Sequence, residues 1–276
     1  MEEKISAAAQ AYNTAFPVTW GRAWMNDPPG GSLCGHWEGL IKSFRSRAPL
    51  GESAPEFSGE LLDGGEFRLS GFRGRKSVLL VFGSIACPPC VTNISANTPS
   101  LVSLYAQYRD AVEFCYVYTR EAHPGRKIGP HTGMGMKKAN AAKLRQEEGM
   151  TFPLVVDSME GTIHQSYVDP QFNNSVFLVN RAGIIVYKSA WLDTSELPQV
   201  LDDVKLWDER GTTDKAIKKT YSERIRPLRE PFDSKSNAKF KWLMEFIGLN
   251  PHEMGNLPGL AADASPTATK SDRKQT

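Results

Sequence analysis

A continuous apolar run that leads straight into a pair of cysteines constrains this chain more than any other feature. The run covers residues 77–84 and reads Ser-Val-Leu-Leu-Val-Phe-Gly-Ser. An unbroken apolar run of this length is typical of a strand buried on both faces, because half-buried strands alternate apolar and polar residues. Cys87-Pro-Pro-Cys90 follows, and Pro88 suits the first turn of a helix. The sequence therefore predicts a buried strand that passes into a helix at Cys87.

Strands and helices alternate along the rest of the chain. Further strands are predicted at 112–118 and 153–157, and hairpins at 57–69, around Asp63-Gly-Gly, and at 175–188. Helical spacing predicts helices after Cys87, interrupted at Pro99, and over 136–148, 161–167 and 194–207. Residues 120–136 show little pattern and are predicted to form a long loop, which in a compact domain is often functional. This order predicts an α/β fold, a three-layer α/β/α sandwich.

The chain is expected to divide into three parts. Residues 1–50 carry Trp20, Trp24 and Trp37 and form an N-terminal extension. Residues 51–207 contain the predicted strands and form the main domain. Residues 208–276 form a helical, basic extension, with a small, polar tail from about residue 259 that is expected to be disordered.

Charge and composition exclude several classes of protein. The 276 residues include 33 Lys and Arg against 31 Asp and Glu, and a net charge of +2 gives no electrostatic reason to expect a nucleic-acid partner. No run of about 18 apolar residues occurs, so no membrane span is expected. The acidic N-terminus lacks a secretory apolar segment, so we expect a cytoplasmic protein.

Four cysteines are too few for a disulfide-stapled scaffold of this size. Cys87 is expected at a helix N-terminus, whose partial positive charge stabilises a thiolate, and Cys90 one turn later can attack a mixed disulfide on Cys87. Such a pair in a strand–helix–strand context is typical of a thioredoxin-like redox site. A zinc half-site lacks a second pair of ligands in this sequence, and inert burial of both thiols is the other alternative. Cys115 is expected in the core, and Cys34 receives no role.

A second group of candidates follows the strand at 112–118. Ligands collect beyond the carboxyl ends of parallel strands, so Tyr118, Glu121 and His123 are expected near Cys87. His123 can titrate near neutral pH and pass a proton, and Glu121 could hold it in one tautomer. His131 lies further along the same loop. The remaining histidines are expected to be structural: His36, His164 and His252.

Together these residues resemble the iodothyronine deiodinases. Phe82-Gly83-Ser84-Ile85-Ala86-Cys87-Pro88-Pro89 is similar to that family's active-site segment, in which selenocysteine stands at the position of Cys87. Tyr118-Thr-Arg-Glu-Ala-His123, Ile128-Gly-Pro-His131 and residues 152–159 are similar to three later segments, in the same order. The resemblance covers roughly residues 54–205. Cysteine in place of selenocysteine, Ala86 in place of threonine and the additional Cys90 are departures from the family pattern.

The resemblance implies a thioredoxin-like fold with a deiodinase-type catalytic domain at 51–207. It implies that Cys87 is a nucleophile for reductive dehalogenation of an iodinated aromatic small molecule. Ser84 would donate a hydrogen bond near its sulfur, and His123 would donate a proton or contact the ligand. Tyr118, Glu121 and His131 would form the proton and hydrogen-bond network. No cofactor or metal is expected, an external thiol donor of thioredoxin or glutathione type would regenerate the enzyme, and a homodimer is left open.

Two alternatives remain open. Ala54-Pro-Glu-Phe57 and Ser84-x-x-Cys87 also resemble peroxiredoxins and related thiol reductases. The chain would then be a peroxiredoxin-like peroxidase or a thiol-disulfide oxidoreductase that uses the Cys87 and Cys90 pair. A non-catalytic binding protein, with a partner on the basic extension, is the third hypothesis, and the intact Cys, Glu and His set argues against it.

Overall fold

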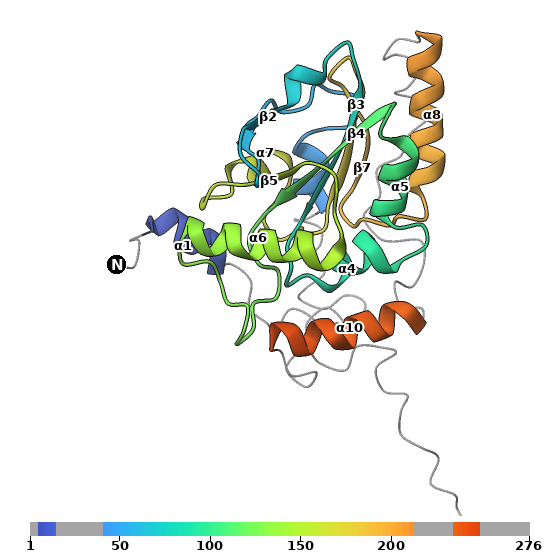
Figure 1. Cartoon of the computed structure of the whole chain (residues 1–276). Helices are drawn as coiled ribbons and strands as arrows, with labels where there is room; N and C mark the ends of the chain where they lie inside the picture. The colour runs from blue at the N-terminus through green and yellow to red at the C-terminus, as the bar shows by residue number, and fades with distance from the viewer. Residues whose placement is uncertain (1–4, 15–40, 212–233, 249–276) are drawn as a thin grey trace, which may run out of the picture.

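The computed structural model describes residues 5–14, 41–211 and 234–248. A five-stranded mixed sheet with the order β5-β4-β3-β6-β7 lies at its centre (Figure 1). The predicted alternation of strands and helices is confirmed. The strands of the sheet are β3 (Ser77–Gly83), β4 (Val112–Tyr118), β5 (Leu154–Val156), β6 (Val176–Val179) and β7 (Ile185–Ser189).

The pairing of the strands brings several chain segments to one edge of the sheet. β3 and β4 are parallel, and their register pairs Gly83 with Tyr118, so both strands end at the same edge. β6 is antiparallel to β3 and pairs Val176 with Val81, so β6 begins at that edge. The predicted hairpin with β7 is present, because β7 pairs antiparallel with β6. Residues that follow β3 and β4, or that precede β6, are therefore neighbours.

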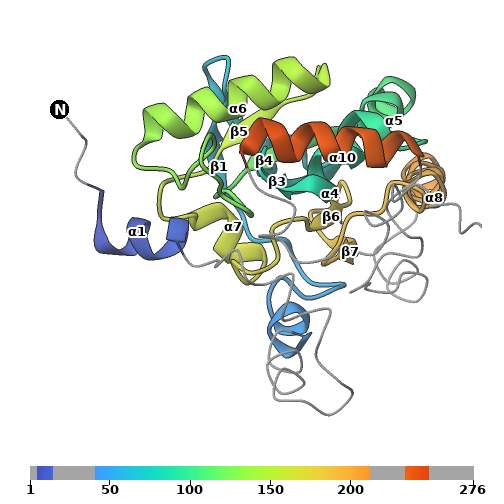
Figure 2. The same cartoon turned by 90° about the horizontal axis from the view of Figure 1, so that it is seen from below.

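The sheet is covered on both faces, as Figures 1 and 2 show. Side chains of alternating strand residues enter two cores, because successive residues of a strand point to opposite faces. Leu79 and Val81 pack with α5 (Leu101–Tyr108), α6 (Met134–Glu148) and α8 (Leu197–Arg210). Leu80 and Phe82 pack with a helix at 41–46, the hairpin of β1 (Ser58–Glu60) and β2 (Glu66–Arg68), the 3-10 turn η1 (Leu69–Phe72) and α7 (Thr162–Tyr167). This is the expected three-layer arrangement.

The helix after Cys87 is divided as the sequence predicts. It comprises α4 (Pro88–Val91), a π-helical turn η2 (Thr92–Ala96) and then α5. Pro99 lies in this interruption. Proline lacks the backbone N–H that a continuous helix would need at this position. Ser100 starts α5 afresh, because its side chain accepts a hydrogen bond from the backbone N–H of Ser103. The segment that carries the cysteines is therefore short.

The extensions add helices that the sequence located only in part. α1 (Ala7–Thr14) and α10 (Ser234–Ile247) flank the main domain. The predicted helix at 194–207 is α8, which starts and ends three residues later, at Leu197 and Arg210. The α8 start is explained by Pro198, which suits a first helical turn. Cys34, the tryptophans of residues 1–50 and the tail from residue 259 lie outside the described residues. Among the helices described, none combines the length and apolar character needed to cross a membrane.

Candidate active site

Cys87 and Cys90 form a disulfide at the start of α4. Cys87 is the N-cap residue, Pro88 and Pro89 begin the helix, and the two Cα atoms are 5.2 Å apart. Both residues are nearly inaccessible, with 3% of Cys87 and 1% of Cys90 exposed. The expected placement of the pair is present, with the two sulfurs one turn apart at the positive end of a helix.

Gly83, the last residue of β3, provides the space that the disulfide occupies. A Cβ atom on Gly83 would lie 2.9 Å from Cys90 Sγ and would collide with the Tyr116 hydroxyl. Cys90 Sγ also lies 3.6 Å from the backbone oxygen of Asn173, in the segment before β6. A side chain at position 83 would therefore displace the sulfur of Cys90.

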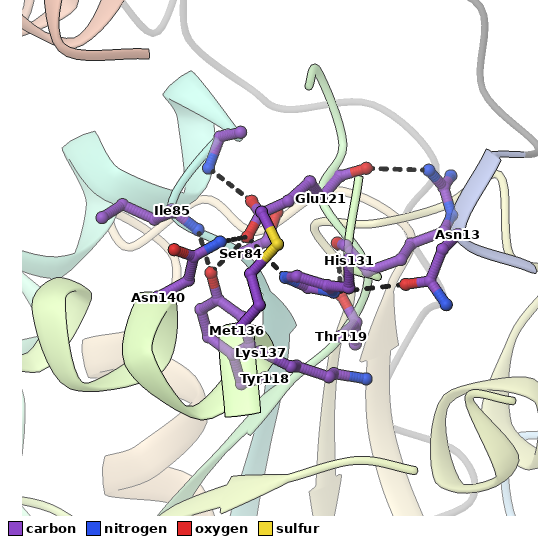
Figure 3. Close-up of polar contacts among 12 residues, drawn as sticks. Asn13, Ser84, Ile85, Tyr118, Thr119, Glu121, His131, Met136, Lys137 and Asn140 are labelled. Carbon is purple, nitrogen blue, oxygen red and sulfur yellow. Dashed lines mark hydrogen bonds and ion pairs between the residues drawn. The ribbon is translucent and has the colours of Figure 1, made fainter. Parts of the chain in front are cut away.

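The carboxylate of Glu121 is the centre of a buried polar network (Figure 3). Its Oε1 accepts hydrogen bonds from the Tyr118 hydroxyl at 2.5 Å and the Asn140 amide at 3.1 Å, and it lies 2.9 Å from His131 Nε2. Its Oε2 accepts a hydrogen bond from the backbone N–H of Ala86 at 2.9 Å. Burial alone would raise the pKa of Glu121, but the hydrogen bond and charge of His131, with the other donors, hold that pKa below its ordinary value. Glu121 is thus held as a carboxylate.

The geometry around His131 fixes a proton on its Nδ1 atom. Asn13 donates through its amide nitrogen to the backbone oxygens of Ala9 and Met159, so its Oδ1 is the atom that faces His131 Nδ1, at 3.2 Å. An amide oxygen accepts only, so Nδ1 carries a proton. Nε2 faces the carboxylate of Glu121 at 2.9 Å. His131 and Glu121 are therefore a buried, hydrogen-bonded pair.

This network holds the turn that presents Cys87. The backbone N–H of Ile85 donates to the Tyr118 hydroxyl at 3.3 Å, and that of Ala86 donates to Glu121. The backbone N–H of His123 donates to the Ala86 oxygen at 2.9 Å. Tyr118 remains a phenol, because burial and then the charge of Glu121 raise its pKa well above the ordinary value. Both side chains act on the peptide groups directly before the cysteine.

A second set of hydrogen bonds joins the ends of β3 and β4 to the segment before β6. Ser84 Oγ accepts from the backbone N–H of Ala122 and from the Asn173 amide, each at 3.1 Å. The Thr119 hydroxyl donates to Asn173 Oδ1 at 2.8 Å. In these bonds Ser84 is an acceptor, and its predicted donation to the Cys87 sulfur stays a prediction.

His123 differs from the sequence expectation. The imidazole that Glu121 contacts is that of His131, so the expected pairing of Glu121 with His123 was wrong. The reason is the loop after β4, which returns at 131 and buries its second histidine against Glu121. Desolvation and then the charge of Arg120 lower the pKa of His123 to about 4, so this ring is neutral at pH 7.

The structure brings together most of the residues that the sequence singled out. Glu121, Tyr118 and His131 are in direct contact, while Ser84, Cys87, Cys90 and His123 lie on the adjoining turn and loop. Cys115 is fully buried in the core and His164 is held between Tyr12 and the Phe172 oxygen, as structural roles require. The residues that sequence analysis missed are Asn13, Thr119, Asn140 and Asn173.

The asparagines gave no sequence signal, because each is one polar residue in an unremarkable stretch. In the described part of the chain, no group of three or more His, Cys, Asp or Glu side chains is placed to hold a metal ion. The arrangement places two sulfurs beside the buried pair of Glu121 and His131.

Comparisons with known proteins agree with this geometry. Residues 49–201, more than half of the chain, match the Redoxin family. The chain is 31% identical over 147 residues to thyroxine 5-deiodinase from Gallus gallus, a match that covers 49% of this chain and 55% of that enzyme. It is 29% identical over 140 residues to the thiol-disulfide oxidoreductase ResA from Geobacillus thermodenitrificans, covering 50% of this chain and 68% of ResA.

The chain thus spans about half the length of the deiodinase and two thirds that of ResA. The thioredoxin domain of a thiol-disulfide oxidoreductase from Bacteroides vulgatus aligns with a TM-score of 0.42 at 23% identity, covering 56% of this chain and 96% of that domain. The match to the family covers every strand of the central sheet and the disulfide at the start of α4. This chain, with its thioredoxin-like α/β fold, belongs to the Redoxin family.

Proposed function

We propose that this protein is a thiol-disulfide oxidoreductase that works through Cys87 and Cys90. The observation that carries the proposal is the disulfide itself, which joins two cysteines one turn apart with Cys87 at the N-cap of α4. A helix N-terminus favours a thiolate, so Cys87 is the sulfur that exchanges with partners. The similarity to ResA supports the same class of reaction.

The reaction balances with an external dithiol as the reductant. A donor thiolate attacks Cys87 Sγ, the Cys87–Cys90 bond breaks, and the electron pair leaves on Cys90 as a thiolate. The second donor thiol releases Cys87 and closes the donor's own disulfide. The reduced protein then attacks a substrate disulfide with Cys87, and Cys90 resolves the mixed disulfide. A donor of thioredoxin type fits this scheme, and with glutathione a second molecule would supply the second thiol and leave as the glutathione disulfide.

Trapping the mixed disulfide tests the proposal. Reduced Cys90→Ser is incubated with oxidised glutathione and analysed by mass spectrometry after proteolysis. A stable glutathione adduct on Cys87 is expected, because the resolving thiol is gone, whereas the wild type returns to its internal disulfide. Cys115→Ser is the matched control and should behave as the wild type, since burial raises the pKa of the Cys115 thiol well above its ordinary value. Absence of any adduct on Cys87 would contradict the proposal.

Reductive deiodination of an iodinated aromatic is the second candidate function. The buried Glu121, His131 and Tyr118 network favours it, because a plain disulfide exchange needs no proton store of this kind. The similarity to thyroxine 5-deiodinase also supports it. In that reaction the Cys87 thiolate would take the iodine, and the aromatic carbon would keep the electron pair and take a proton. Cys90 would then attack Cys87 Sγ, release iodide and form the observed disulfide.

Iodide release distinguishes the two functions. Wild type, Cys87→Ala and Glu121→Gln are each assayed with thyroxine and dithiothreitol. Release by the wild type that is lost in Cys87→Ala and reduced in Glu121→Gln supports deiodination. No release from a wild type that exchanges disulfides normally leaves thiol-disulfide exchange as the function.

A further inference from the structure

Tyr116 carries a buried hydroxyl that lacks a hydrogen-bond partner in the described part of the chain. The residue is fully buried on β4, and its Oη has no partner among residues 5–14, 41–211 and 234–248. Buried hydroxyls in folded proteins are normally paired, because desolvation without a partner is unfavourable. An unpaired donor of this kind indicates a group that acts in another state of the protein.

The position of this hydroxyl connects it with the disulfide. The space above Gly83 Cα is bordered by two atoms, the Tyr116 hydroxyl oxygen and Cys90 Sγ. Gly83 has no side chain between them. The register of the sheet produces this arrangement, since Tyr116 pairs with Val81 and so points to the same face as Gly83, two residues further along β3.

Cys90 needs a hydrogen-bond donor when the disulfide opens. Reduction leaves the electron pair on Cys90, and the group 3.6 Å from its sulfur, the Asn173 carbonyl, can only accept. The nearby backbone N–H groups are already engaged, because Val91 donates to the Cys87 oxygen and Thr92 to the oxygens of Pro88 and Pro89. The Tyr116 hydroxyl is a donor without a hydrogen-bond partner in the described part of the chain, and it borders the same space as the sulfur of Cys90.

We propose that the Tyr116 hydroxyl donates a hydrogen bond to the Cys90 thiolate whenever the Cys87–Cys90 disulfide is open. This inference rests on the proposed disulfide exchange. The hydroxyl stabilises Cys90 as the leaving group when a donor thiolate attacks Cys87. It also holds Cys90 ready for its return attack on a mixed disulfide, in which Cys90 bonds to Cys87 and the partner leaves as a thiolate.

Tyr116 keeps its own proton throughout this cycle. Burial, followed by the charges of Glu121 and Glu148, raises its pKa well above the ordinary value. Glu121 lies 2.9 Å from His131, and Glu148 is paired with Lys239 at 2.6 Å. The hydroxyl is therefore a fixed donor and not an acid that loses its proton to the thiolate.

Tyr116→Phe tests the inference, with Tyr108→Phe as the matched control. Tyr108 loses a hydroxyl that bonds Asp202, away from the cysteines. In Tyr116→Phe the equilibrium with dithiothreitol should shift about tenfold toward the disulfide, which is about 30 mV, because a hydrogen bond to a charged group is lost only in the open state. Resolution of a glutathione adduct on Cys87 should slow about tenfold at pH 7, and its pH profile should move to higher pH.

The outcomes separate this inference from the proposed function. If the wild type exchanges disulfides normally and Tyr116→Phe has the same equilibrium, the same resolution rate and the same pH profile, the inference alone is overturned. A wild type that cannot exchange overturns the proposed function and the inference with it. Should Tyr116→Phe fail to fold, the wild type with ¹³Cζ-labelled tyrosine provides the test. The Tyr116 signal should shift on reduction while that of Tyr108 stays constant, and an unchanged Tyr116 signal overturns the inference.

Discussion

Glu121 illustrates how a buried charge becomes useful at the scale of a single residue. Its carboxylate is fully buried, yet it accepts hydrogen bonds from Tyr118, Asn140 and the backbone of Ala86 and lies beside the ring of His131. Such a buried pair is costly to break, because the group that is left behind is desolvated and unpaired. Glu121 therefore positions the turn before Cys87.

Replacing Glu121 with Gln should lower the free energy of unfolding at pH 7 by about 3 kcal/mol, the usual cost of breaking a buried pair. The native pKa of Glu121 is lower than in the unfolded chain, so its contribution is complete above about pH 4.3 and is lost as the pH falls through the native pKa. Urea denaturation of both proteins between pH 3 and 8 measures the difference. A difference in the free energy of unfolding between the two proteins that stays constant over this pH range would contradict the assignment of Glu121 as an ionised carboxylate.

His123 gives a separate prediction. Its native pKa of about 4 lies below the unfolded value of about 6.5, so the native state binds fewer protons between these values. The stability that neutral His123 contributes is full above about pH 6.5 and is lost as the pH falls toward 4. His123→Gln should remove this part of the pH dependence of the melting temperature. The turnover of the wild type should also show no inflection near pH 6.5. An inflection there that disappears in His123→Gln would refute the low native pKa of His123.

The sequence identified most of this site for a simple reason. Ser84, Cys87, Tyr118 and Glu121 follow two adjacent buried strands, and the carboxyl ends of parallel strands converge. Local pattern is sufficient for that inference. The choice of His131 over His123 as the partner of Glu121 depends on how the loop folds back, and no local pattern encodes it.

At the scale of elements, the end of β3 is fitted to the disulfide. Gly83 is a glycine because Cys90 Sγ and the Tyr116 hydroxyl fill the place of a side chain, and its backbone conformation is one that any residue adopts. The apolar pattern predicted the strands, and Pro99 predicted the interruption of the helix. Helix boundaries were less predictable: α8 starts at Leu197, with Pro198 in its first turn, and not at the predicted residue 194.

Gly83→Ala should destabilise the protein by about 1–3 kcal/mol, because the added methyl group overpacks a filled site. Gly135→Ala is the matched control. Gly135 lies in the first turn of α6 with open space around it, so alanine should stabilise by up to about 1 kcal/mol through helix propensity. Chemical denaturation measures both, and equal effects of the two substitutions would contradict the close packing at Gly83.

At the scale of the whole molecule, segments outside the family-matched region are built into the domain. The buried amine of Lys188 on β7 donates to the backbone oxygens of Phe44 at 2.7 Å and Arg47 at 3.3 Å, at the end of the helix at 41–46. α10 packs Leu243 and Ile247 into the core and lies at the same end of the sheet as α4 (Figures 1 and 2). The backbone N–H groups of Lys127 and Ile128 both donate to the Ile247 oxygen.

Leu243→Asp should release α10, because a carboxylate cannot occupy a fully buried apolar site. The amides of Lys127 and Ile128 would lose their acceptor and should exchange their hydrogens faster, as resolved by hydrogen–deuterium exchange. The amide of Thr119, which is bonded to the Gly83 oxygen in the sheet region, serves as the internal control and should stay protected. Unchanged exchange at 127 and 128 would show that α10 does not support this loop.

The bond between Asn13 and His131 has a practical consequence for anyone who shortens the chain. The family match begins at residue 49, so a protein trimmed to the recognisable domain would lack α1 and Asn13. His131 would then lose the acceptor that fixes its Nδ1 proton, and the ring would be free to turn or to change tautomer. The isolated domain would keep both sulfurs but would lose the fixed imidazole beside Glu121, so activities compared between long and short versions would belong to two differently arranged sites.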